Sequence, residues 1–248
     1  MHREKIFGVN PVAEALKAGR PIRRLLIAEQ RQVDRDVQAI LRIAKERGVE
    51  VKITGREDLN REAPHALHQG IIAITVAAEY AKLDAMLQIP AERGEMPLFL
   101  ILDGVEDPRN LGAILRTAEV AGVHGVIVPE RRAAGLTETV AKTAAGALEY
   151  VPVAKVVNIV NTIEEFKKNG IWVAGAEAGS DVTYWDADFA RPTAVVLGGE
   201  DKGIRRLVRD HCDYIVSLPL LGKINSLNVS VATGILLYEI LRQRRAKK

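Results

Sequence analysis

The chain has 248 residues, of which 48% are hydrophobic, so it can bury the core of one large domain or two small ones. No apolar run approaches the roughly 20 residues that a membrane span needs, which excludes an integral membrane protein. The one cysteine, Cys212, excludes an internal disulfide, and no hydrophobic signal segment follows the first residues. We therefore expect a cytoplasmic protein.

The net charge of +3 is unevenly distributed. Residues 1–78 contain 14 Lys and Arg against 10 Asp and Glu, whereas the remaining residues contain 21 against 22. A basic N-terminal part suits a polyanionic partner, but an ordinary solvated surface explains the same excess equally well.

Residues 1–78 alternate short helical and strand patterns and predict a small α/β unit. Asn10 followed by Pro11 indicates a helix start with Asn10 as the N-cap. The predicted elements are a helix to about Ala18, a strand over 24–28, a helix over 37–47, and strands over 49–53 and 70–77. Residues 79–97 lose this periodicity and contain Pro90, Gly94 and Pro97, so we expect a linker there.

From residue 98 onward, continuous apolar strands alternate with helices. The predicted strands cover 98–102, 126–128, 171–174, 194–197 and 214–217, and the predicted helices cover 111–121, 138–145, 159–168 and 225–242. Such a pattern is typical of a mostly parallel sheet with helices on both faces, and it predicts a second domain over 98–248.

The usual phosphate-binding signatures are missing from this domain. No G-x-G-x-x-G follows a strand, and Gly222-Lys223 lacks both the upstream glycine and the following Ser or Thr of a P-loop. His65 and His68 have no Cys or carboxylate cluster beside them, so we predict no metal site.

Three polar loops follow predicted strands, at the sheet edge where ligands of parallel α/β folds bind. They cover Asp103–Asn110, Gly198–Gly203 and Pro219–Asn228. Helix capping and a simple turn could account for any one loop, but three on one edge favour a site. In the third loop, small polar residues run past the expected cap into the first turns of the last helix, where they are normally avoided.

These loops carry a specific resemblance. DGVEDPRNLGAILRTAE, VLGGEDKGI and LPLLGKINSLNVSVATGI, in this order, resemble the three motifs of the SPOUT superfamily of RNA methyltransferases, in its 2′-O-ribose (SpoU/TrmH) branch. The resemblance covers about residues 98–243. FGVNPVAEAL and HQGIIA in the N-terminal unit resemble the L30e-like substrate-binding domain of that branch.

The resemblance implies a fold and a cofactor. In this family the C-terminal part of the chain forms a deep trefoil knot, against the general rule that chains are unknotted. The cofactor is S-adenosylmethionine, which carries no phosphate and therefore needs no glycine-rich anion cradle. By the family pattern Gly198, Leu218 and Leu227 line the adenine slot, and Gly199 and Pro219 shape it.

The resemblance also implies the catalytic centre. It places there Asn110, Arg116, Glu200, Ser226 and Asn228. A guanidinium stays protonated, so Arg116 would hold a phosphate and steady the developing alkoxide rather than act as the base. Asn110, Ser226 and Asn228 would position the ribose, with Glu200 orienting a hydrogen-bond donor.

The expected partner is ribosomal RNA, with a guanosine ribose of 23S rRNA as the target and Arg20, Arg23 and Arg24 contacting the RNA. The family further implies a homodimer whose site is completed across the interface. Two other readings stay open: a tRNA 2′-O-ribose methyltransferase, and a non-catalytic RNA-binding protein of ribosome assembly.

Overall fold

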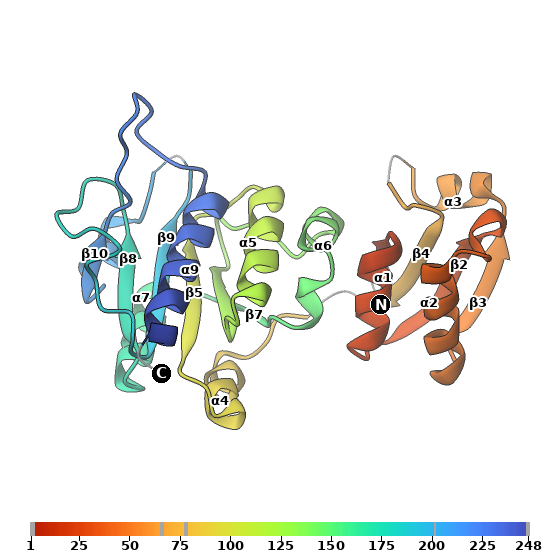
Figure 1. Cartoon of the computed structure of the whole chain (residues 1–248), viewed down its shortest axis with the longest axis horizontal. Helices are drawn as coiled ribbons and strands as arrows, with labels where there is room; N and C mark the ends of the chain where they lie inside the picture. The colour runs from red at the N-terminus through yellow and green to blue at the C-terminus, as the bar shows by residue number, and fades with distance from the viewer. Residues whose placement is uncertain (1–2, 65–66, 77–78, 201, 247–248) are drawn as a thin grey trace. The chain divides into compact units, whose positions relative to one another are not determined.

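The computed structural model describes residues 3–64, 67–76, 79–200 and 202–246 (Figure 1). The chain divides into two compact units, each described by itself below. The first unit contains residues 1–79 and 136–150, and the second contains residues 80–135 and 151–248.

The first unit is built on a four-stranded sheet with the order β1-β4-β2-β3. Strand β4 pairs antiparallel with both β1 and β2, whereas β2 and β3 are parallel. The elements are β1 (Arg3–Phe7), α1 (Val9–Lys17), β2 (Ile22–Ala28), α2 (Arg35–Glu46), β3 (Glu50–Thr54), α3 (Arg56–Glu62), β4 (Ile71–Val76) and α6 (Glu138–Ala144), with 3-10 turns at Glu29–Arg31 and Ala147–Glu149.

Helices cover both faces of this sheet. Successive side chains of a strand point to opposite faces, so one strand contributes to both packed layers. Ile71 and Ala73 pack with α1 and α2, while Ile72 packs with Leu59 of α3. The prediction of a small α/β unit is therefore confirmed. The strand β1 and the helix α3 are additions that the sequence patterns did not predict.

Helix α1 begins earlier than predicted. Gly8, with φ +91°, occupies the N-cap position, and Asn10 lies inside the first turn, so the assignment of Asn10 as the cap is wrong. Pro11 remains within the first turn, where a missing N–H costs little.

The second unit is built on six strands with the order β10-β8-β9-β5-β6-β7, and every neighbouring pair is parallel. The predicted parallel α/β architecture is confirmed. The elements are α4 (Leu83–Arg93), β5 (Leu98–Asp103), α5 (Pro108–Val120), β6 (Gly125–Pro129), β7 (Val153–Val156), α7 (Ile159–Lys168), β8 (Trp172–Ala176), β9 (Thr193–Gly198), α8 (Arg206–Asp210), β10 (Tyr214–Val216) and α9 (Val229–Ala246).

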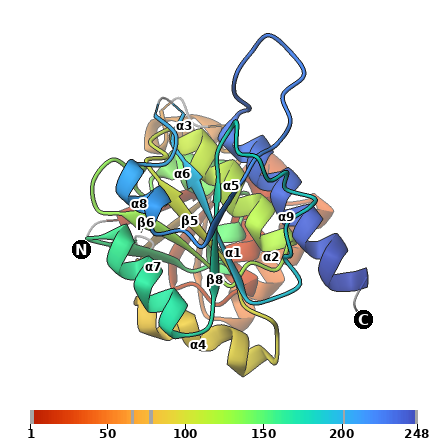
Figure 2. The same cartoon turned by 90° about the vertical axis from the view of Figure 1, so that its left-hand side faces the viewer.

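Helices lie on both faces of this sheet, with α5 and α9 side by side on one face and α4, α7 and α8 on the other (Figure 2). Phe99 of β5 stacks on Phe166 of α7 with ring centroids 5.1 Å apart. Leu236 and Ile240 of α9 are fully buried. Burial on both faces explains why the strands are continuously apolar.

The expected linker over 79–97 contains a helix. Met86 and Pro90 of α4 are buried, and Met86 belongs to the core that includes Phe99 and Phe166. Gly94 ends the helix in the left-handed conformation, with φ +63°. The sequence did not predict this helix because proline normally ends a helix, whereas Pro90 lies inside the last turn of α4.

The last helix begins later than predicted. Residues 218–228 are an irregular loop that projects beyond the sheet in Figures 1 and 2, and α9 starts at Val229. The Asn228 Oδ1 accepts hydrogen bonds from the backbone N–H groups of Ser230 and Val231, at 2.9 and 3.4 Å. Asn228 thus caps the helix.

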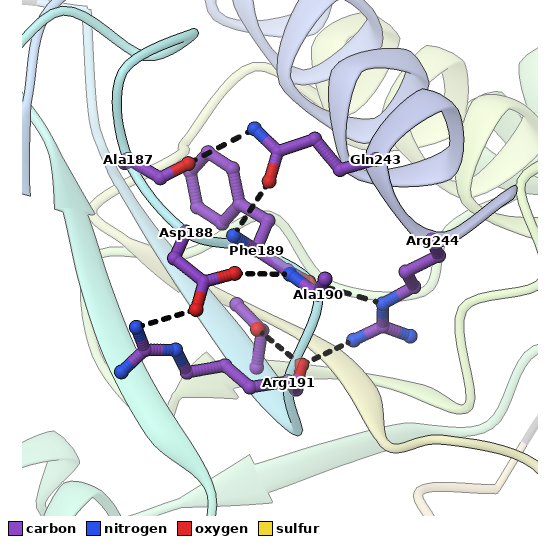
Figure 3. Close-up of polar contacts among 8 residues, drawn as sticks. Ala187, Asp188, Phe189, Ala190, Arg191, Gln243 and Arg244 are labelled. Atoms are coloured by element: carbon purple, nitrogen blue, oxygen red, sulfur yellow. Dashed lines mark hydrogen bonds and ion pairs between the residues drawn. The ribbon is translucent and has the colours of Figure 1, made fainter. Parts of the chain in front are cut away.

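The end of α9 is fastened to the segment that precedes β9 (Figure 3). Gln243 accepts a hydrogen bond from the Phe189 N–H and donates one to the Ala187 carbonyl. The Arg244 guanidinium donates to four carbonyl oxygens, those of Met96, Pro97, Phe189 and Arg191, at 2.7 to 3.3 Å. Burial lowers the pKa of Arg244 to about 10, so the side chain is still charged at neutral pH.

We predict that Arg244→Ala destabilises the second unit. Each partly buried carbonyl that loses its donor costs about 1–3 kcal/mol, so the expected loss in the free energy of unfolding is about 3 kcal/mol or more. Both tryptophans, Trp172 and Trp185, lie in this unit, so tryptophan fluorescence during urea unfolding reports on it directly.

Arg245→Ala is the matched control, because Arg245 is the exposed neighbour on the same helix. It should unfold like the wild type, and Arg244→Lys should lie between the two. Equal stability of Arg244→Ala and Arg245→Ala would contradict the role given to Arg244.

Candidate active site

The three predicted loops leave the same edge of the second sheet. The strands β5, β9 and β10 end at Asp103, Gly198 and Val216, and all three run parallel. Asp103 and Gly198 are direct neighbours in the β5–β9 ladder, and the Gly199 N–H donates to the Asp103 carbonyl at 2.9 Å. The expected meeting of these loops follows from this topology.

Two glycines after β9 allow the loops to approach at backbone distance. A Cβ at Gly198 would lie 2.0 Å from the carbonyl carbon of Gly203, and a Cβ at Gly199 would lie 2.0 Å from the Gly104 oxygen. No side chain can occupy such a space, so glycine is required at both positions for this packing.

A cavity of about 410 Å³ opens beside these glycines. Four of the five residues predicted to hold the cofactor line it, namely Gly198, Gly199, Leu218 and Leu227. Pro219 follows Leu218 in the chain but is not among the lining residues. Glu200 and Ser226, predicted to be catalytic, also line the cavity.

A hydrogen-bonded series joins all three loops. The Asn110 Nδ2 donates to the Glu200 Oε1 at 2.5 Å, and the Asn228 Nδ2 donates to the Asn110 Oδ1 at 3.0 Å. Since the Asn228 Oδ1 is occupied by the N-terminus of α9, the orientation of each amide is fixed by its partners. Glu200 therefore sets which way Asn110 points, and Asn110 sets Asn228.

The other two predicted catalytic residues are placed differently. Ser226 is exposed at the cavity. Arg116 is exposed on α5, and among the described residues it has no hydrogen bond or ion pair. Arg116 shares a helix face with Arg109 and Val120, seven residues before it and four after, rather than with Asn110.

The cavity suits an uncharged heterocycle such as adenine. Its walls combine Leu197, Leu218 and Leu227 with the peptide groups of the loop Gly198–Gly203, which we call the glycine loop. In the described part of the chain, no backbone N–H from Leu218 to Leu227 donates to another backbone group. An apolar slot next to free peptide groups is what an adenosyl group needs, so the residues present fit S-adenosylmethionine.

The sequence patterns did not predict several contacts and residues at this edge of the sheet. Asp103, only 2% exposed, accepts hydrogen bonds from the backbone and the guanidinium of Arg205, with Arg205 Nε 2.7 Å from its Oδ1. Arg131 and Arg132 follow β6 at the same edge, forming a fourth polar loop after a strand. Their position behind the predicted strand over 126–128 was a usable signal.

The remaining titratable groups of interest have structural roles. The His68 Nδ1 accepts a hydrogen bond from the Gly70 N–H and its Nε2 lies 2.9 Å from the Asn60 Oδ1, while His65 lies outside the described residues. Burial raises the pKa of the Cys212 thiol to about 12, so it is not a nucleophile. Within the described ranges no His, Cys, Asp and Glu cluster could hold a metal ion. No helix there is both long and apolar enough to cross a membrane.

Comparison with known families assigns both parts of the chain. Residues 97–238 match the SpoU rRNA Methylase family. Residues 5–81 match the RNA 2′-O ribose methyltransferase substrate binding family. The two matches are separated by residues 82–96, which contain α4, and together they span most of the chain.

Whole-chain relatives agree with these matches. The chain is 44% identical over 239 residues to YacO of Bacillus subtilis, which is named as a member of the TrmH family of tRNA/rRNA methyltransferases; the alignment covers 96% of this chain and 95% of YacO. A Staphylococcus aureus relative of the same description is also 44% identical, with 96% of both chains covered.

Solved structures show the same fold. The SpoU methyltransferase AviRb from Streptomyces viridochromogenes, in complex with AdoMet, aligns with a TM-score of 0.80 and 28% identity over 98% of this chain and 91% of AviRb. The TrmH/SpoU tRNA modifying enzyme of A. aeolicus aligns over 66% of this chain and 83% of its own, with a TM-score of 0.57 and 32% identity. The chain therefore belongs to the SpoU/TrmH family of S-adenosylmethionine-dependent RNA ribose methyltransferases.

Proposed function

We propose that this protein transfers a methyl group from S-adenosylmethionine to the 2′-hydroxyl of a guanosine in 23S rRNA, in the cytoplasm. The observation that carries the proposal is the series Glu200–Asn110–Asn228, which fixes two amides and is joined through Glu200 to the wall of a cavity suited to an adenosyl group. Fixed donors and acceptors beside a cofactor cavity are what the alignment of a hydroxyl group requires.

The chain's own residues orient and polarise the ribose. S-adenosylmethionine, when bound, supplies a methyl group on a positively charged sulfur. In this proposal Asn110, Asn228 and Ser226 hold the ribose hydroxyls, which is supported by the hydrogen bond by which Glu200 keeps the Asn110 amide in one orientation. Holding the attacking oxygen in line with the methyl group accounts for several kcal/mol of the barrier, of the ~7–11 kcal/mol that orientation can supply.

Arg116 supplies positive charge to the reacting nucleotide in this proposal. Its guanidinium stabilises the negative charge that develops on the ribose oxygen as the proton leaves. Since Arg116 has no partner among the described residues, it is available to a phosphate or an alkoxide.

Ribosomal RNA is the favoured substrate because the chain carries an N-terminal unit that matches the substrate-binding family. With this unit the two-domain chain resembles the 23S rRNA guanosine-2′-O-methyltransferase RlmB. Of the three arginines expected to contact RNA, Arg20 pairs with Glu149 at 2.7 Å and Arg24 with Glu50 at 2.9 Å. Arg23 is exposed on β2 and remains the best candidate of the three. A tRNA substrate is the alternative, since the relatives are named for both RNAs.

We also infer that the C-terminal part is knotted. Strand β10 lies at one edge of the sheet. After it, residues 218–228 run past the loop Gly198–Gly203, and the chain then enters α9, which packs against α5. This return path across the sheet edge supports the trefoil knot that the family resemblance implies.

A homodimer is supported by an exposed apolar face. Val120 of α5 and Val231 and Tyr238 of α9 are 63%, 51% and 55% exposed, although α5 and α9 pack side by side. Exposed apolar residues on two helices that pack together favour an interface there. Arg116 lies on the Val120 face of α5, so a dimer through this face would bring Arg116 to the boundary between two sites.

We predict a particle of twice 27.1 kDa for the wild type by size-exclusion chromatography with light scattering. Val120→Glu should yield the monomer, because burying an unpaired carboxylate raises the dissociation constant at least about tenfold. Val33→Glu is the control, since Val33 is 84% exposed in the first unit. A monomeric wild type would overturn the dimer.

The function itself is tested by methyl transfer from labelled S-adenosylmethionine to 23S rRNA and to bulk tRNA, followed by mapping of the methylated ribose. We expect one guanosine of 23S rRNA to be labelled. Arg116→Ala should lower kcat by about 10²–10³-fold, the usual effect of removing one donor to a developing charge, while cofactor affinity stays unchanged.

Arg93→Ala, an exposed arginine on the opposite face of the sheet, should methylate like the wild type. Labelling of tRNA instead of 23S rRNA would select the alternative substrate. Cofactor binding without transfer to either RNA would show a non-catalytic RNA-binding protein, and full turnover by Arg116→Ala would remove Arg116 from the mechanism.

A further inference from the structure

A second cavity, of about 300 Å³, lies next to the cofactor cavity at the same edge of the sheet. Both cavities share Gly199, Glu200, Lys202 and Gly203 as a common wall. On its other side the second cavity is lined by the ends of β5 and β6 and the loops that follow them. It therefore borders Glu200, the residue that orients Asn110, without overlapping the adenine slot between Leu218 and Leu227.

The cavity carries uncompensated positive charge. Asp103 and Arg205 neutralise each other through their ion pair, while Glu200 accepts a hydrogen bond from the neutral amide of Asn110 and keeps its charge. Arg131 and Arg132 are exposed, and neither has a hydrogen bond or ion pair within the described chain. With Lys202 and Arg205 they make four cationic side chains on the cavity wall against three carboxylates, those of Asp103, Glu106 and Glu200, so the lining is net positive by one charge.

The arginine pair stands on a loop with a defined shape. Its two flanks are fixed by hydrogen bonds from the Glu130 N–H to the Val156 carbonyl and from the Ala134 N–H to the Val105 carbonyl, both 2.9 Å. Arg132 has a positive φ of 60°, which a residue with a Cβ adopts at a cost of about 1–3 kcal/mol. The backbone hydrogen bonds at the two flanks constrain the loop that holds Arg132 in this conformation.

We propose that this second cavity binds a backbone phosphate of the RNA strand, next to the ribose that is methylated. Arg131 and Arg132 are the ligands of the phosphate, since guanidinium groups bind phosphate oxygens in pairs of parallel hydrogen bonds. The wall shared with the cofactor cavity sets the spacing between this phosphate and the reacting ribose. This inference rests on the proposed function for the identity of the strand as a methylation substrate.

The test measures the affinity for 23S rRNA and for bulk tRNA, each at a series of KCl concentrations, using whichever RNA the wild type binds more tightly. Each phosphate contact adds about 0.7–0.9 to the slope of log K against log salt. The double variant Arg131→Gln/Arg132→Gln should reduce that slope by about 0.7–0.9 and weaken binding about tenfold or more at ~0.1 M KCl. Calorimetry should show unchanged affinity for S-adenosylmethionine.

Arg206→Gln is the matched control, because Arg206 adjoins Arg205, has a side chain that is 92% exposed and lines neither cavity. It should bind RNA like the wild type. Glu106→Gln should bind RNA more tightly, since it removes a carboxylate that repels a phosphate and that has no hydrogen-bond or ion-pair partner within the described chain. Weaker binding by Glu106→Gln would instead assign the cavity to a nucleobase edge and overturn the phosphate site.

An unchanged salt slope in the double variant, an equal change in Arg206→Gln, or no salt-dependent RNA binding by the wild type would also overturn the proposal. The proposed function fails separately. If the wild type binds RNA with the predicted slopes but methylates neither RNA, the phosphate site stands without the reaction. If it methylates RNA and the double variant keeps the wild-type slope, the reaction stands without the site.

Discussion

The site depends on a backbone contact that leaves no room for a side chain. Gly198 and Gly199, at the end of β9, lie against Gly203–Ile204 on one side and Gly104 on the other, at distances that only glycine permits. The contact brings the loop after β5 and the loop after β9 together as one wall. That wall separates the cofactor cavity from the second cavity, which Arg131 and Arg132 line.

The third loop is joined to this wall by side chains rather than by backbone. Asn110 links Glu200 of the glycine loop to Asn228, and Asn228 caps α9. The start of the last helix is therefore connected to the orientation of the two amides, those of Asn110 and Asn228. At the other end of α9, Arg244 and Gln243 hold the helix against the segment before β9. Both ends of one helix thus stabilise the geometry around the cofactor cavity.

Much of this arrangement could be predicted from the sequence, because parallel strands have a plain apolar pattern and their loops must share an edge. The predicted Gly198–Gly203 and Asp103–Asn110 loops meet as expected. The predicted start of the last helix was wrong because Asn225 and Ser226 are residue types that favour helix starts, whereas the residue that caps α9 is Asn228. The helix α4 was missed because Pro90 and Gly94 resemble linker residues, and its burial of Met86 is a tertiary effect. The Asp103–Arg205 ion pair joins residues 102 apart, beyond any local pattern.

The affinity of Gly199→Ala for S-adenosylmethionine, measured by isothermal titration calorimetry, tests most directly whether the glycine contact shapes the cofactor cavity. Gly222→Ala is the control, because Gly222 lies in the third loop with nothing within 4 Å of an added Cβ. Circular dichroism establishes that both variants are folded. We predict that the wild type and Gly222→Ala bind the cofactor with the same affinity and that Gly199→Ala binds it at least about tenfold more weakly, a loss of about 1.4 kcal/mol. Wild-type affinity in a folded Gly199→Ala would contradict the account.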